Sequence, residues 1–225
     1  MKKILLSVLI AVFCISCSEG EGDGGGSEKF VEIYVNKGVV TSKPNTFDTG
    51  ISGQWVSSDP FVATVENGII IAEHVGEADV AFGNKIYHVK VLSSLPLLDP
   101  PVVEFGKPMD YIASKEQREK HKGTYKGLLY HGETSYVDKI WYYFSDAGAS
   151  LNKIQIVMNG SRAYLHAATW LGHFYEQADP VTIDGVYNLV YIDAYEREDA
   201  QIIVYCPNTI PLGTDCVITY LPITH

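Results

Sequence analysis

Short runs of alternating apolar and polar residues, separated by turn signals, fill the chain between residues 30 and 92. Such alternation is typical of strands with one buried face. Asn67-Gly68 separates two of these runs and predicts a two-residue hairpin, because both central positions of a type I′ turn need positive φ. The predicted strands are 31–35, 63–65, 69–71, 78–82 and 86–91. The pattern therefore predicts a strand-rich first domain over residues 29–92.

The pattern changes after a proline-rich linker, residues 93–103. Two helices are predicted, one over residues 109–122 following Pro108, and one from Ser161 to about Gln177. The predicted strands here are 125–130, 137–144, 153–158, 187–193, 201–206 and 216–221. The expected fold is mainly β: a small α+β domain over residues 104–225, an antiparallel sheet with two helices on one face, follows the first domain.

The second predicted helix carries three side chains that are candidates for a contact surface. Its apolar face is expected to be formed by Tyr164, Ala167, Ala168, Leu171, Phe174 and Tyr175. His166 and His173 fall on the opposite side, with Trp170 alongside, and an aromatic ring on a wet face indicates a contact surface. The alternative is that the histidines simply face solvent. Seven residues advance a helix by about 10 Å, so the two imidazoles are not expected to share a metal.

The first 16 residues have the pattern of a secretory signal: a basic start and an apolar run of residues 4–15 that is too short to span a bilayer. Ile15-Ser16-Cys17 resembles the lipobox of bacterial lipoproteins. The resemblance implies that lipid is attached to Cys17, which becomes the mature N-terminus and attaches the protein to a membrane.

Residues 17–28 form an acidic, glycine-rich linker without apolar residues to bury. Its acids, Glu19, Glu21 and Asp23, resemble the acidic export tag of Bacteroidetes lipoproteins that reach the cell surface. This resemblance implies an outer-membrane lipoprotein on the cell surface. The alternative is a solvated spacer on a lipoprotein that stays on the periplasmic face.

A second resemblance covers the first domain. It is carried by four motifs, namely Trp55-Val56-Ser57-Ser58-Asp59-Pro60, Val62-Ala63-Thr64-Val65, Asn67-Gly68 and Val75-Gly76. These motifs resemble the bacterial immunoglobulin-like domain, group 2. The family implies a β-sandwich with Trp55 in its core, and it is common in spacers and adhesion modules of exported proteins.

Cys206 and Cys216 flank a loop rich in turn residues between two predicted strands. An exported protein meets an oxidising compartment, where two such cysteines can form a disulfide that brackets a hairpin. The alternative is a pair of free thiols buried in neighbouring strands.

The formal charge of −10 disfavours nucleic acid as a partner. The sequence contains no G-x-S-x-G, H-E-x-x-H or P-loop motif, so neither catalytic residues nor a cofactor is expected. We expect a surface lipoprotein whose second domain binds glycan or an envelope or host protein. Two alternatives stay open: a periplasmic structural or assembly lipoprotein, and a hydrolase acting on glycans with carboxylates among Asp138, Asp146, Asp179, Asp184 and Asp193.

Overall fold

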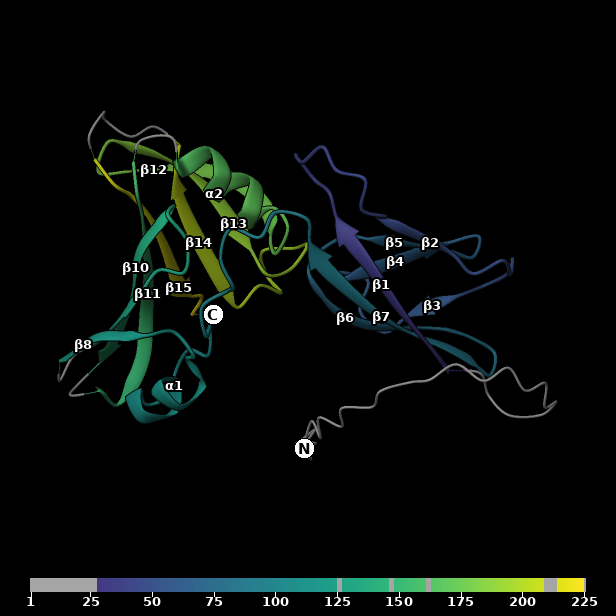
Figure 1. Ribbon diagram of the computed structural model, residues 1–225, viewed down its shortest axis with the longest axis horizontal. Helices are drawn as coiled ribbons and strands as arrows, with labels where there is room; N and C mark the ends of the chain where they lie inside the picture. The colour runs from purple at the N-terminus through teal and green to yellow at the C-terminus, as the bar shows by residue number, and fades with distance from the viewer. Residues whose placement is uncertain (1–27, 125–126, 146–147, 161–162, 209–213, 225) are drawn as a thin grey trace.

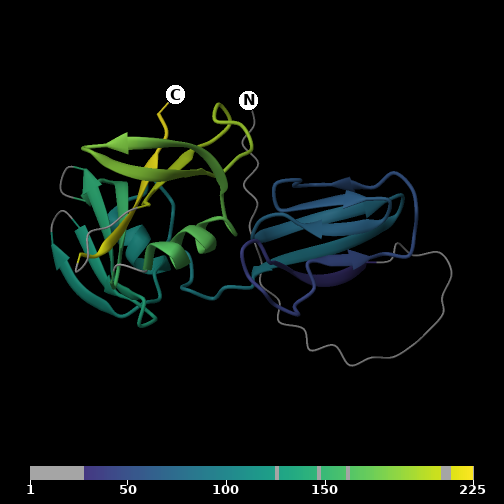
Figure 2. The same ribbon diagram turned by 90° about the horizontal axis from the view of Figure 1, so that it is seen from above.

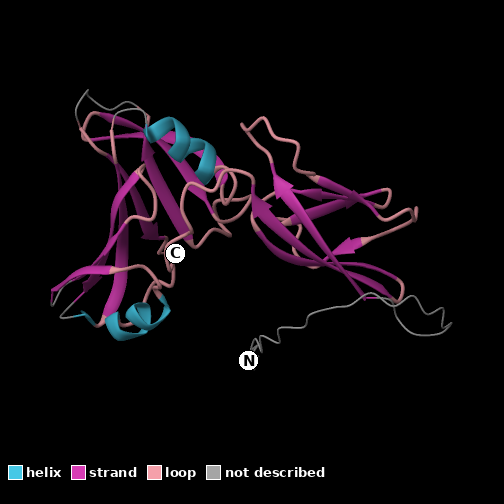
Figure 3. Ribbon diagram, in the orientation of Figure 1, coloured by secondary structure: helices cyan, strands magenta, loops and turns pink. Residues whose placement is uncertain are grey.

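The computed structural model describes residues 28–124, 127–145, 148–160, 163–208 and 214–224. The protein is mainly β: within the described ranges, 49% of the residues lie in strands, and there are two helices (Figure 3). Buried apolar residues form one cluster before Leu92 and separate clusters after Ser94. We call residues 28–93 the N-terminal part and residues 95–224 the C-terminal part.

The N-terminal part contains seven strands in two sheets. The strands are β1 (Glu28–Val35), β2 (Thr46–Asp48), β3 (Val56–Ser57), β4 (Ala63–Glu66), β5 (Ile69–Ala72), β6 (Gly76–Phe82) and β7 (Lys85–Ser93). One sheet has the order β1-β7-β6-β3 and the other β2-β5-β4. Strand β1 pairs in parallel with β7, and the other pairs are antiparallel.

Apolar alternation places the core of this part between the two sheets. Ile33 of β1, Val80 of β6 and Ile70 of β5 are fully buried in the same cluster. The predicted hairpin at Asn67-Gly68 is confirmed, with φ values of 51° and 84°. Trp55 lies half-buried against this core and donates its indole N–H to the Ile51 carbonyl at 3.0 Å.

The C-terminal part is built on one eight-stranded antiparallel sheet. Its strands are β8 (Lys120–Thr124), β9 (Gly127–His131), β10 (Val137–Ser145), β11 (Ser150–Met158), β12 (Glu176–Ile183), β13 (Val186–Ile192), β14 (Ile202–Pro207) and β15 (Cys216–Pro222). The strand order is β12-β13-β14-β15-β11-β10-β9-β8. The six strands predicted from the sequence are all present.

The two helices are shorter than predicted. Helix α1 (Met109–Lys115) ends seven residues before the predicted end, and α2 (Ala163–Leu171) ends six residues before it. Strands β8 and β12 begin within the last residues of the predicted helices, after short connections that are neither helix nor strand. The prediction was wrong there because β12 is largely exposed, so its sequence lacks the alternation that marks a half-buried strand.

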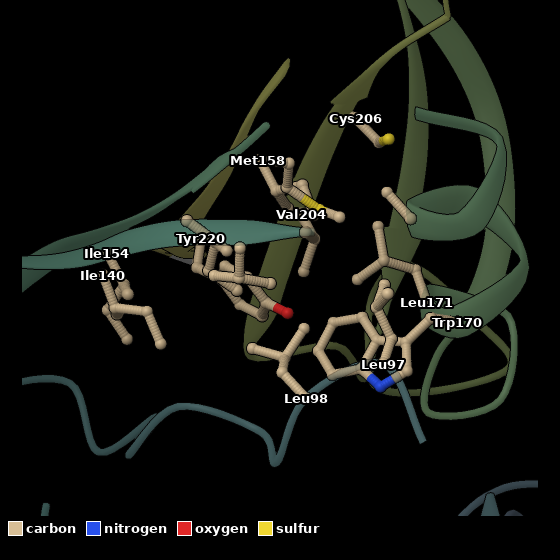
Figure 4. Packing of buried hydrophobic residues seen from close by; sticks show 14 of the residues in the cluster. Leu97, Leu98, Ile140, Ile154, Met158, Trp170, Leu171, Val204, Cys206 and Tyr220 are labelled. Carbon is tan, nitrogen blue, oxygen red and sulfur yellow. The ribbon is translucent and has the colours of Figure 1, made fainter. Parts of the chain in front are cut away.

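One large core lies between the sheet and both helices. Leu171 of α2 lies in one buried cluster with Ile140, Ile154 and Tyr220 of the sheet (Figure 4). Ile112 of α1 belongs to the same cluster. Both helices therefore cover the same face of the sheet. A smaller cluster covers the other face at one end, formed by Val190, Ile192, Ala200 and Ile203.

The two parts lie side by side along the long axis of the molecule (Figures 1 and 2). Strand β1 runs toward the C-terminal part, and its parallel partner β7 ends at the same side (Figure 1). Glu28 therefore lies at the end of the N-terminal part that is remote from the eight-stranded sheet.

Candidate binding surface

Trp170 does not form the contact surface expected from the sequence. Its side chain is 1% exposed and belongs to the core with Leu97 and Leu98 (Figure 4). The buried residues of α2 are Ala163, Ala167, Trp170 and Leu171, which follow the i, i+4, i+7, i+8 spacing of one helical stripe. The predicted face was displaced because it included Phe174 and Tyr175, which lie beyond the end of the helix.

The two histidines of the expected contact surface have different positions. His166 is exposed on α2, with its ring centroid 5.1 Å from that of Tyr136. His173, by contrast, is fully buried where the two parts of the molecule meet. The structure thus does not bring His166, Trp170 and His173 together on one surface, and this prediction was wrong for Trp170 and His173.

His173 bonds to the N-terminal part through its ring and its backbone. Its Nε2 lies 2.7 Å from the Lys37 carbonyl oxygen, and its Nδ1 lies 2.7 Å from Ser93 Oγ. The Val75 backbone N–H donates to the His173 carbonyl at 2.7 Å. A carbonyl only accepts, so Nε2 carries the proton, and Nδ1 of the neutral ring accepts from the Ser93 hydroxyl.

His74 is a second fully buried histidine at the same junction. Its ring stacks on Phe61 with centroids 4.0 Å apart, and its Nδ1 donates to the Phe61 carbonyl at 2.8 Å. Its Nε2 lies 3.3 Å from Lys37 Nζ and 3.4 Å from Glu176 Oε2. A neutral imidazole fits this arrangement, because Nε2 then accepts a hydrogen bond from the lysine ammonium.

Burial lowers the pKa of both histidines from the ordinary value of 6.5, and the charge of Lys37 lowers both further. For His74, the Phe61 carbonyl and the carboxylates of Glu176 and Glu73 oppose this effect. The neutral forms are thus favoured in the folded protein. We call His74, His173 and their partners the junction.

A cleft of about 430 Å³ opens beside the junction and is lined by Lys37, Gly38, Thr169, Glu176 and Tyr191, among others. Its two charged groups, Lys37 and Glu176, already contact His74. The cleft therefore has few free groups for binding a ligand.

The side of the sheet opposite the large core carries a half-buried aromatic pair. Along β10, Ile140, Tyr142 and Phe144 are buried, whereas Trp141 and Tyr143 between them are only partly buried. The Trp141 and Tyr143 rings are nearly parallel, at 17°, with centroids 5.6 Å apart. These two rings project from the middle of a rigid sheet, where neighbouring strands fix their positions.

Strand register extends this pair into a row across four strands. Trp141 of β10 lies opposite Gln155 of β11, which lies opposite Thr219 of β15, which lies opposite Tyr205 of β14. Gln155 Nε2 donates to Thr219 Oγ1 at 3.3 Å. Neighbouring strands are about 4.8 Å apart, so the row is about 14 Å long. We call the surface formed by Trp141, Tyr143, Lys153, Gln155, Thr219 and Tyr205 the outer face.

Lys153 completes the outer face. Its Nζ lies 4.2 Å from the centre of the Tyr143 ring, a cation–π contact that holds the ammonium at the surface. A hollow of about 440 Å³ lies beside it, lined by Tyr143, Phe144, Asn152, Lys153 and Leu221. The outer face thus combines aromatic rings, an amide, a hydroxyl and a cation.

Cys206 and Cys216 are free, buried thiols in β14 and β15. The structure therefore contains the second of the two predicted alternatives. Tyr205 pairs with Thr219, so the same register places Cys206 diagonal to Cys216. Diagonal pairs lie farther apart than the Cβ separation of about 3.5–4.5 Å that a disulfide needs. A hydrogen bond to Cys216 and burial raise the pKa of the Cys206 thiol.

Two of the aspartates considered for hydrolysis have structural roles. Asp193 Oδ1 accepts hydrogen bonds from the backbone N–H groups of Gln201 and Ile202, at 2.8 and 2.9 Å. Asp138 forms an ion pair with Lys139 at 2.7 Å. Asp146 and the predicted lipidation site, Cys17, lie outside the described residues.

Within the described residues, no group of three or more His, Cys, Asp or Glu side chains is placed to hold a metal ion. The same residues include no helix that is both long and apolar enough to cross a membrane. Comparison of the chain with protein-family models, curated proteins and solved structures finds no match.

Sequence reasoning missed the aromatic pair, although a signal for it was present. A strand over 137–144 was predicted, and strict alternation within it puts Trp141 and Tyr143 on the face opposite Ile140 and Tyr142. No local signal pairs His173 with Lys37, because 136 residues separate them.

Proposed function

We propose that the protein is a cell-envelope lipoprotein, attached through lipid on Cys17 and exposed on the cell surface. Residues 29–92 form an immunoglobulin-like spacer of group 2, residues 93–103 a linker, and residues 104–225 a non-enzymatic binding domain. Residues 1–16 are the signal peptide and residues 17–28 the tether. The two sheets that share one core, with separate clusters beyond residue 94, support this division.

The direction of β1 supports the role of the N-terminal part as a spacer. The chain enters β1 at Glu28, remote from the C-terminal part, and leaves β7 at Ser93 beside it (Figure 1). Eight residues of strand rise by about 26 Å. A tether that ends at Glu28 would therefore hold the eight-stranded sheet at the far end of the molecule from the membrane.

The half-buried aromatic pair on the outer face is the observation that carries the binding function. Trp141 and Tyr143 lie on the solvent side of β10, whereas the aromatic residues that alternate with them, Tyr142 and Phe144, are buried. Exposed aromatic rings beside polar groups are common where proteins bind partners, because the rings contribute a large apolar area at a small entropic cost. We propose that this face binds a glycan of the envelope or of a host.

Protease treatment of intact cells tests the location. A surface protein is digested together with surface controls, while a periplasmic control stays whole. An intact protein on cells whose surface controls are cut would instead favour the periplasmic structural role.

The lipid attachment is tested separately. Replacement of Cys17 by Ala is expected to abolish incorporation of labelled fatty acid.

A glycan array tests the binding function with the full chain in detergent. Trp141→Ala is expected to remove the glycan signals that the unaltered protein gives. Phe30→Ala is the matched control, because Phe30 is 78% exposed but lies on β1, in the other part of the molecule. Equal signals from the Trp141 variant and the unaltered protein would show that the outer face is not the binding surface.

A further inference from the structure

We infer that the outer face recognises an anionic polysaccharide, an inference that rests on the proposed glycan-binding function. The sequence distributes charge unevenly along the eight-stranded sheet. Residues 120–158, which include β8 to β11, contain five lysines and three acids. Residues 176–201, at the other end of the sheet, contain seven acids and one arginine. In a chain of net charge −10, the strands that carry the aromatic pair are thus locally basic.

The one charged residue of the outer face, Lys153, is a cation. Strands β9, β10, β11 and β15 contain a single acid, Asp138, which pairs with Lys139. Lys153 is held over the Tyr143 ring, which neutralises no charge, so its ammonium stays available to an anion. His131 of β9 is exposed and lies opposite Lys139 of β10, and its ring N–H can donate a further hydrogen bond to an anion. A carboxylate or sulfate beside Tyr143 would therefore meet the Lys153 ammonium, whereas the acids Asp138 and Asp215 act on Lys139, nearer the start of β10.

The shape of the face favours an extended sugar chain. Trp141, Gln155, Thr219 and Tyr205 follow one another across adjacent strands in a row of about 14 Å. A sugar ring has an apolar C–H face that packs on an aromatic ring, and its hydroxyls bond to amides and hydroxyls. The row has an aromatic ring at each end, where the apolar face of a sugar can pack, and Gln155 and Thr219 between them, where sugar hydroxyls can bond. Lys153, on β11 like Gln155, lies to one side of the row, where an acidic substituent would project.

Polygalacturonate and its methyl ester are suitable probes, because methylation removes the carboxylate charge and retains the sugar chain. The full chain in detergent micelles is titrated with each polymer. We expect polygalacturonate to bind at least about tenfold more tightly than its methyl ester. A hydrogen bond to a charged group contributes about 1.5–3 kcal/mol, and a tenfold change in affinity corresponds to about 1.4 kcal/mol. Lys153→Gln should abolish this difference, and Trp141→Ala should weaken binding of both polymers by about tenfold.

Lys90→Gln is the matched charge control, because Lys90 is an exposed lysine on β7 of the N-terminal part. It is expected to leave both affinities unchanged. Polyglutamate, an anionic chain without sugar rings, is expected to bind at least about tenfold more weakly than polygalacturonate.

The outcomes separate this inference from the function on which it rests. Equal affinity for the two polymers, with Trp141→Ala still weakening both, would refute the anionic preference and leave glycan binding at the outer face intact. Polyglutamate binding as tightly as polygalacturonate would show recognition of charge alone and refute the polysaccharide. No binding of any glycan, charged or neutral, by the unaltered protein would refute both proposals.

Discussion

Replacing His173 by Phe tests whether the junction stabilises the protein. Phe keeps a planar ring in a fully buried position but removes both ring nitrogens. The Lys37 carbonyl, 2.7 Å from Nε2 in a part-buried hydrogen bond, then loses its imidazole donor, which costs about 1–3 kcal/mol. Ser93 loses less, because its hydroxyl can turn to the Leu95 carbonyl 2.9 Å away. With about 0.5–1.5 kcal/mol for this second bond, we expect a loss of about 2–4 kcal/mol.

Urea unfolding of the full chain, followed by circular dichroism at pH 8, measures this loss. His166→Phe is the control, because it makes the same substitution at an exposed position on α2. The control is expected to change the free energy of unfolding by less than about 0.5 kcal/mol. A His173 variant as stable as this control would refute the assigned role of the two ring hydrogen bonds.

Three further predictions concern stability. The free energy of unfolding should fall as pH drops below about 6.5, because burial lowers the pKa of His74 and His173 and the unfolded chain then binds more protons than the folded one. Full stability is present above pH 6.5, and urea unfolding between pH 8 and 5 should show a loss of up to about 1.4 kcal/mol per pH unit for each histidine. A stability that does not change over this pH range would contradict the prediction. Trp170→Ala should cost about 3–5 kcal/mol in urea unfolding, whereas a surface tryptophan would cost less than about 0.5. Gly68→Ala should lower the melting temperature more than Gly50→Ala, because both glycines have positive φ but only at Gly68 would the new Cβ lie 2.1 Å from a backbone carbonyl oxygen; equal shifts would contradict this.

Alternation and turn chemistry were enough to predict most of the strands. The Asn67-Gly68 turn and the strand over 137–144 were predicted because local residues determine both. The ends of the helices were not predicted, since helix α2 ends at Leu171 although apolar residues continue to Tyr175. Phe174 and Tyr175 instead join the core from the turn that leads into β12, and that arrangement depends on tertiary packing.

The candidate site was less predictable than the fold. Trp170 was assigned to the surface because the predicted helix was too long. Apolar residues beyond its true end were counted in the apolar face, which displaced that face away from Trp170. The junction could not be predicted, because it joins Lys37, His74 and Ser93 to His173 across long separations in sequence. The outer face also depends on register, which brings Tyr205 and Trp141 into one row.

The junction and the outer face involve different regions of the same sheet, and this separation makes their roles distinguishable. Junction contacts come from His173, from Glu176 at the start of β12 and from Tyr195 after β13, whose hydroxyl donates to the Pro60 carbonyl at 3.1 Å. Strand β12 forms one edge of the sheet, and four strands separate it from β10, which carries Trp141. Because the two sets of contacts share no residue, their energetic effects should be nearly additive. His173→Phe should therefore weaken folding with little change in glycan affinity, and Trp141→Ala should do the reverse.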